Sequence, residues 1–187
     1  NQPIGDWDTS SVTDMQRMFE QAKSFNNGGS PSISGWDTSS VTDMNNMFIG
    51  TSSSSNTVIF NQPLDGWDVT GVTAMNSMFH YAKNFNNGGS TGINNWRPSS
   101  CTTMSNMFFD AIDFNQPIGD WDTSSVTDMQ SMFSTRRLGA GHSFNQDVGN
   151  WDVSSVTNMK KVFGSTYYDC PFNNGGSTGI NNWDTSS

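Results

Sequence analysis

Long apolar runs, clustered positive charge and aliphatic side chains are all scarce in this 187-residue chain. Lys and Arg number 8 against 17 Asp and Glu, which gives a net charge of -9. Binding to nucleic acid or to an anionic membrane surface needs clustered Lys and Arg. No apolar run approaches the ~20 residues of a membrane span. The sequence therefore argues against a nucleic-acid partner and against membrane insertion within this segment.

Cysteine is also rare, because the chain holds only Cys101 and Cys170. Two cysteines do not make a disulfide framework. Cys101 stands in a repeated position that most repeats fill with Val, so we expect a small buried hydrophobic side chain there. Cys170 falls in a variable loop. A bridge between them would span two repeats, about 10 Å at ~4.8 Å per repeat, which is beyond the reach of a disulfide.

What the chain does have is an internal repeat marked by tryptophan, at intervals of 25 to 32 residues. The anchors are Trp7, Trp36, Trp67, Trp96, Trp121, Trp151 and Trp183. We therefore expect a single array of about six repeats over residues 1–187. The chain begins inside a motif, without an initiator Met or a signal peptide, so we expect it to be a segment of a longer protein.

Further positions recur in register with each Trp. An aliphatic residue precedes it by three positions, Met follows it by eight, and Met or Val follows it by eleven. A Phe follows at twelve, and a Phe-Asn pair closes the unit. All 11 methionines fall in these two columns, in the company of Phe, which favours a core of stacked Trp, Met and Phe over a soft-metal site.

The spacing within one unit predicts its secondary structure. Apolar residues over 11–22 follow a helical stripe, and Ser11 with Asp14 fits a capping box, so we expect a short helix. Residues 117–122 suggest a strand of two to four residues, stacked in parallel on its neighbours. The Asn-Gly-Gly-Ser segments at 27–30, 87–90 and 174–177 are expected to be surface loops whose turns need positive φ. The predicted fold is an α/β solenoid with strand-turn-helix units of about 25 residues.

Residues 114–133 carry the fullest copy of the motif, Phe-Asn-Gln-Pro-Ile-Gly-Asp-Trp-Asp-Thr-Ser-Ser-Val-Thr-Asp-Met-x-x-Met-Phe. This motif resembles the bacterial surface-protein repeat of about 26 residues, the BspA-like or DUF285 repeat, a relative of leucine-rich repeats. The resemblance extends over the whole chain. It implies an extracellular location at the cell surface, a role in adhesion or surface structure, and no catalytic residues.

An acidic column is the clearest candidate for chemistry. The residue after each Trp is Asp8, Asp37, Asp68, Arg97, Asp122, Asp152 or Asp184. Stacked carboxylates could hold calcium, or each Asp could cap the turn that follows it. Arg97 interrupts the column, and no calcium-loop motif is present, so capping is the favoured interpretation and we assign no metal or cofactor.

Two other features are given structural interpretations without chemistry. His80 and His142 lie in variable segments without a repeated nucleophile nearby, so no catalytic site is assigned and we expect a protein that is not an enzyme. A threonine column follows each turn and could bind ice or glycans, although a solvated face is the simpler interpretation. Its members are Thr13, Thr42, Thr73, Thr102, Thr127 and Thr157.

These observations predict a non-catalytic, extracellular structural repeat module of a surface protein, stalk or filament. The lack of capping repeats suggests head-to-tail self-association. The alternative is an adhesin-type module that binds a glycan or a host protein. That alternative would be favoured by a patch of aromatic residues outside the repeat columns, but the candidates Tyr81, Phe109, Tyr167 and Tyr168 look scattered in the sequence.

Overall fold

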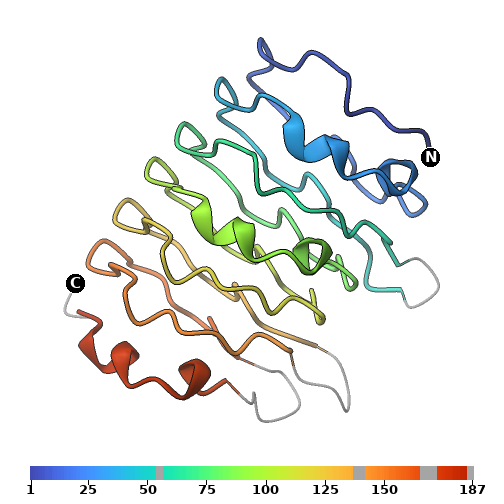
Figure 1. The fold of residues 1–187 in the computed structure, drawn as a ribbon. Coiled ribbons are helices and arrows are strands. Elements are labelled where there is room, and N and C mark those ends of the chain that lie inside the picture. The colour runs from blue at the N-terminus through green and yellow to red at the C-terminus, as the bar shows by residue number, and fades with distance from the viewer. Residues whose placement is uncertain (54–56, 137–141, 165–171, 185–187) are drawn as a thin grey trace.

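The computed structural model describes residues 1–53, 57–136, 142–164 and 172–184. The chain winds through repeated turns that lie side by side, with its two termini at opposite ends of the stack (Figure 1). We call each turn a coil, running from the Asn of one Phe-Asn pair to the Phe of the next. Coils 1 to 7 comprise residues 1–25, 26–60, 61–85, 86–114, 115–144, 145–172 and 173–184.

Backbone hydrogen bonds join each coil to the next. In coil 1, alternate N–H groups at Met15, Arg17, Phe19 and Gln21 donate to carbonyls of coil 2 at 2.8–3.0 Å. The same alternation recurs from coil 2 through coil 5. One isolated parallel bridge per coil accompanies it, in the order Asp14↔Asp43, Asp43↔Ala74, Ala74↔Thr103, Thr103↔Asp128 and Asp128↔Asn158. Along this segment the backbone N–H groups bond alternately to the next coil and within their own turns, as at Met15 and Met18, so the polar groups of the backbone are paired without an α-helix or an extended strand.

The predicted α/β solenoid of strand-turn-helix units is therefore wrong. Across the described ranges there is no α-helix, and β-structure is confined to isolated bridges. Residues 11–22 form consecutive turns, with Met18 N–H donating to Met15 and Ala22 N–H to Phe19, at 3.2 and 3.1 Å. A positive φ of 57° at Arg17 and 53° at Gln21 breaks any helix. Turns closed every three residues produce the same apolar spacing as a helix, which explains the error.

The predicted strand is also wrong. Residues 119–120 form a turn, in which Trp121 N–H donates to the Ile118 carbonyl at 3.2 Å. The parallel contact between coils runs instead through the segment that was expected to be helical, at Asp14 and its equivalents. The capping box fails for the same reason, because Asp14 accepts from the Gln16 N–H, two residues on, and starts a turn.

Short 3-10 helices occur where the Asn-Gly-Gly-Ser segments are inserted. Their bounds are η1 Asn27–Gly29, η2 Pro31–Gly35, η4 Asn87–Gly89, η5 Thr91–Asn95, η6 Asn174–Gly176 and η7 Gly179–Asn182. The expected positive φ is present, for example 60° at Gly88. These segments are more than surface loops, because the Asn that opens each one is buried. The Asn87 Oδ1 accepts from the Leu64 N–H of the preceding coil at 2.8 Å.

A ladder of asparagines runs along the stack at the Phe-Asn pairs. Each side-chain oxygen accepts the backbone N–H of the equivalent Asn in the next coil, at 2.8–3.1 Å. The ladder consists of Asn1, Asn26, Asn61, Asn86, Asn115, Asn145 and Asn173. It fixes the register between coils at an edge where no β-bridge does so.

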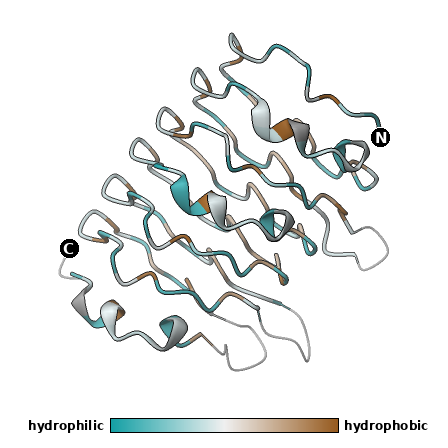
Figure 2. Ribbon diagram, in the orientation of Figure 1, coloured by the Kyte–Doolittle hydropathy of each residue, from teal (hydrophilic) through white to brown (hydrophobic). Residues whose placement is uncertain are grey.

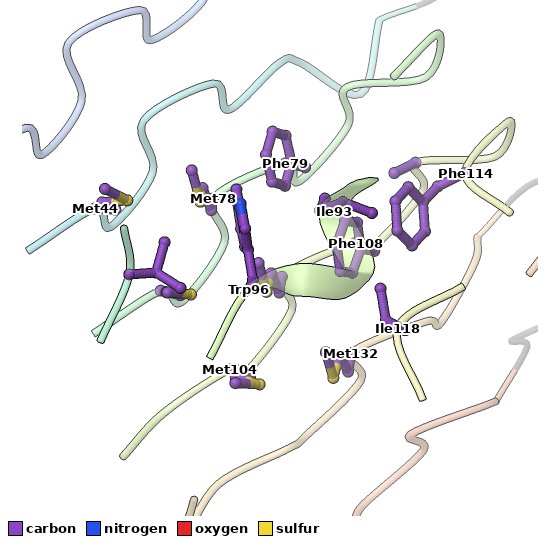
Figure 3. Packing of buried hydrophobic residues seen from close by; sticks show 14 of the residues in the cluster. Met44, Met78, Phe79, Ile93, Trp96, Met104, Phe108, Phe114, Ile118 and Met132 are labelled. Carbon is purple, nitrogen blue, oxygen red and sulfur yellow. The ribbon is translucent and has the colours of Figure 1, made fainter. Parts of the chain in front are cut away.

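The core is made of like residues stacked on like, as the sequence predicted. Trp67 and Trp96 stack with ring centroids 6.4 Å apart, and Phe79 and Phe108 at 5.4 Å. Figure 3 shows Trp96 and Phe108 among Met side chains from several coils. Each indole from Trp36 onward also donates Nε1–H to a carbonyl of the preceding coil, at 2.8–3.2 Å. Hydrophilic and hydrophobic positions are interspersed along the coils (Figure 2).

Candidate functional site

The aspartates of the acidic column accept hydrogen bonds within the turns that follow them. Asp8 Oδ1 accepts from the backbone N–H and the hydroxyl of Ser10, at 3.1 and 2.6 Å. The same pair of bonds recurs at Asp37, Asp68, Asp122 and Asp152. The side-chain hydrogen bond from Ser10, followed by its backbone N–H, lowers the pKa of Asp8. These bonds are the local capping role expected of the column. Among the described residues no three His, Cys, Asp or Glu side chains gather as metal ligands.

The threonine column likewise bonds within the stack. Thr42 Oγ1 donates to the Thr13 carbonyl at 3.2 Å, and the same bond recurs down to Thr157. Most of these threonines are exposed. Each hydroxyl therefore has a fixed donor direction toward the preceding coil, which leaves its lone pairs to solvent.

Two of the titratable residues singled out from the sequence, His142 and Cys101, are buried. Burial lowers the pKa of His142 to about 4, and the ring bridges the Phe108 carbonyl and the Phe144 N–H at 2.9 and 3.0 Å. Burial also raises the pKa of the free Cys101 thiol to about 12. A neutral imidazole between two backbone groups and a protonated buried thiol are poor nucleophiles. Cys170, Tyr167 and Tyr168 lie outside the described residues.

An aromatic cluster outside the repeat columns does exist, contrary to the scattered placement expected from the sequence. His80 stacks on Tyr81 with centroids 4.2 Å apart and meets the edge of Phe109 at 4.8 Å. The Arg136 Cζ lies 5.4 Å from the centroid of the Phe109 ring. Coils 3, 4 and 5 thus bring together residues that are up to 56 positions apart in the sequence.

A pocket of about 240 Å³ opens beside this cluster, across coils 4 to 6. Its lining is mostly polar and includes three cationic side chains. It consists of Asn106, Phe109, Gln130, Ser131, Ser134, Arg136, Lys160 and Lys161. Phe109 and Ser134 both stand thirteen positions after a Trp, and the residue at this position in the next coil is Gly164.

A buried carboxylate holds one wall of the pocket in place. Asp110 is 4% exposed, and its Oδ1 accepts from the Thr135 hydroxyl at 2.7 Å and from the Arg136 N–H at 3.0 Å. Its own N–H donates to the Ser134 carbonyl at 3.0 Å. Bonds to a charged acceptor are the stronger kind, so the backbone that carries Arg136 is fixed before any ligand arrives.

The lining of the pocket carries three cationic side chains although the chain is acidic. Arg136, Lys160 and Lys161 are three of its eight Lys and Arg residues. Over the described part of the chain the one ion pair is Arg17–Glu20 at 3.7 Å, so none of these three cations is neutralised by an ion pair there. Sequence reasoning missed this group. The signal that would have found it is that Arg136, Arg137, Lys160 and Lys161, half of the chain's cations, lie between 136 and 161.

A family model described as "Mycoplasma protein of unknown function, DUF285" matches residues 1–91 and again 88–187. Together the two matches cover the entire sequence. The chain belongs to the DUF285 family. Its repeats are therefore DUF285 repeats, as the motif at 114–133 led us to expect. Neither the curated proteins nor the solved structures gave a match.

The DUF285 repeat positions separate into two groups in this structure. Trp, Met, Phe and Asn columns build the stack in every coil, whereas the pocket uses the variable positions nine, ten, thirteen and fifteen after Trp. No helix of the described DUF285 chain is long and apolar enough to cross a membrane.

Proposed function

We propose that this DUF285 chain is a non-catalytic structural repeat module of an extracellular surface protein, acting as a stalk or spacer. The observation that carries the proposal is the alternating coil-to-coil hydrogen bonding, repeated from coil 1 through coil 6. Stability in such a stack is a sum of nearest-neighbour terms, so length can grow without a new fold. The acidic, polar exterior and the resemblance to bacterial surface repeats support placement at the cell surface.

The chain itself offers a clean test of the spacer role. Residues 1–19 and 115–133 differ only at Arg17 and Ser131. Joining Asn1 of a second copy directly after Phe114 therefore keeps the natural sequence around the join, because Asn1 takes the place of Asn115. Placing residues 1–114 ahead of the full chain should add four coils, or about 19 Å at ~4.8 Å each. Small-angle X-ray scattering should show that added length at an unchanged cross-section.

The matched control breaks the register by placing residues 1–104 ahead of the full chain. We expect that version to gain no ordered length. A register-matched array that became thicker instead of longer, or that did not fold, would contradict the spacer role. Antibody labelling of intact cells that make the natural protein tests the surface location, and labelling only after permeabilisation would refute it.

Self-association end to end belongs to the same proposal. Trp7 and Met18 of coil 1 are 56% and 39% exposed, whereas Trp36 and Met47 at the same positions of coil 2 are 3% and 0% exposed. A further coil stacked on coil 1, from a preceding repeat or from a second copy, would cover both side chains. Electron microscopy across concentrations should reveal fibres with an axial spacing of whole coils. Short particles that never join would rule out the filament.

The second candidate function is ligand binding of the adhesin type, to a glycan or a host protein. The aromatic cluster of buried Phe109 and partly exposed His80 and Tyr81 favours it, because aromatic side chains outside the repeat columns are a common basis for recognition. Removing the cluster would leave the spacer role intact. The two functions therefore separate experimentally, since one depends on the number of coils and the other on a few variable residues.

A further inference from the structure

The pocket on coils 4 to 6 has the chemistry of an anion site. Its three cationic side chains have no ion-pair partner among the described residues, and they come from two adjacent coils. The remaining lining offers donors: the amides of Asn106 and Gln130 and the hydroxyls of Ser131 and Ser134. In a chain of net charge -9, three unpaired cations around one cavity are more than the composition predicts.

The size and shape of the pocket limit the ligand. A volume of about 240 Å³ is below the ~300–1,000 Å³ of pockets for drug-sized molecules. A pocket of this volume holds one sugar ring or a smaller group. The Arg136 guanidinium lies over the Phe109 ring, with its Cζ 5.4 Å from the ring centroid, and the ring itself is only 7% exposed. Planar guanidinium suits bidentate binding of a carboxylate, sulfate or phosphate, and the lysines act as point charges.

We infer that this pocket binds the oxyanion group of a small ligand, such as the carboxylate or sulfate of an acidic sugar residue. The oxyanion would lie between Arg136 and the two lysines, with Ser131 and Ser134 donating to it. This inference deepens the ligand-binding candidate and does not depend on the spacer role.

The rigid wall behind the pocket supports a formed site. Asp110 holds the backbone of Arg136, so binding need not order this part of the main chain. The Asp110 carboxylate faces the Thr135 hydroxyl and the Arg136 N–H, at 2.7 and 3.0 Å, so its charge is turned to the protein interior.

The test is titration of the full chain with four probes: inorganic sulfate, inorganic phosphate, glucuronate and glucose. Calorimetry gives the affinity, and amide chemical shifts at Ser131 and Arg136 give the location. We expect glucuronate to bind and glucose, its neutral counterpart, not to bind. Binding of sulfate or phosphate as strong as that of glucuronate would assign the site to a bare oxyanion, which also supports the inference. Raising the salt concentration from about 0.02 to about 0.2 M should weaken the binding of each anion.

Matched variants localise the effect. The pair Lys160→Gln and Lys161→Gln should weaken glucuronate binding at least tenfold, whereas Arg17→Gln with Lys23→Gln removes the same charge elsewhere and should leave it unchanged. Arg136→Lys keeps the charge and tests the planar group, with an expected loss of several fold. Thermal unfolding checks that each variant is folded. Absence of binding by every anion, or equal binding by both double variants, would overturn the inference while leaving the array test of the spacer role untouched.

Discussion

Asn87 provides the sharpest test of how the coils are held together. It is fully buried, its Oδ1 accepts from the Leu64 N–H, and its Nδ2 donates to Asp65 Oδ1 at 2.6 Å and to the Ser90 carbonyl at 2.8 Å. The substitution Asn87→Asp keeps the shape and the acceptor but turns the donor into an oxygen facing two other oxygens. It therefore removes two hydrogen bonds without creating a cavity.

The magnitude follows from those two bonds. Loss of the bond to the charged Asp65 costs about 1.5–3 kcal/mol, and loss of the bond to Ser90 about 1 kcal/mol. Repulsion between the carboxylates adds to this, so we expect at least about 3 kcal/mol of destabilisation at pH 7. For a chain of this length, each kcal/mol lowers the unfolding midpoint by about 2–4 °C. Scanning calorimetry should therefore record a drop of about 10 °C.

The pH dependence separates the charge effect from simple loss of contacts. A carboxyl forced beside Asp65 has a higher pKa in the folded than in the unfolded state, where it is ~3.9. Its penalty is therefore absent in acid and grows as the pH rises above about 4. The deficit of Asn87→Asp should shrink between pH 7 and pH 4, whereas that of Asn87→Ala should not. Adding Asp65→Asn should restore much of the stability. A deficit that is absent at pH 7, or equal at both pH values, would refute this account of the coil junction.

Two further predictions concern a buried base and a close contact. Burial lowers the folded pKa of His142 to about 4 from an ordinary 6.5, although the ring contacts the Phe108 carbonyl. The free energy of unfolding measured in urea should therefore fall by roughly 3 kcal/mol between pH 6.5 and pH 4. The substitution His142→Gln should abolish that part of the pH dependence. A Cβ on Gly66 would lie 2.3 Å from the Ser34 carbonyl oxygen, so Gly66→Ala should cost about 1–3 kcal/mol of stability in thermal unfolding. A Cβ on Gly71 would have no neighbour nearer than 3.6 Å, so Gly71→Ala should be neutral or slightly stabilising. Equal effects of the two substitutions would contradict the packing described.

The sequence predicted which side chains are buried better than it predicted the secondary structure of the backbone. Burial of Trp, Met and Phe in register follows from periodicity alone, since seven tryptophans and 11 methionines occupy fixed columns. The helix at 11–22 was wrong because closed turns and an α-helix share the same apolar spacing. A hint was available at the position ten after Trp, where Asn46 and Asn106 stand, since asparagine tolerates the positive φ found there.

The pocket was predictable only in part. The concentration of cations between 136 and 161 is visible in the sequence, but nothing there says that Arg136 meets Phe109 or that Ser134 lines the same pocket. Those contacts join different coils, and their register depends on the lengths of the insertions. For the same reason, Tyr81 and Phe109 looked scattered although their rings lie 5.7 Å apart.

The sequence by itself determined which residues repeat, which of them are buried, and that the chain belongs to the DUF285 family. Side-chain identity carries that information, because each column holds one chemical type. The tertiary structure alone decided where the backbone hydrogen bonds go, and it assigned them between coils and within closed turns instead of within helices and strands. It also decided which variable side chains share one cavity, because neighbours across the stack are separated by a whole coil in the sequence.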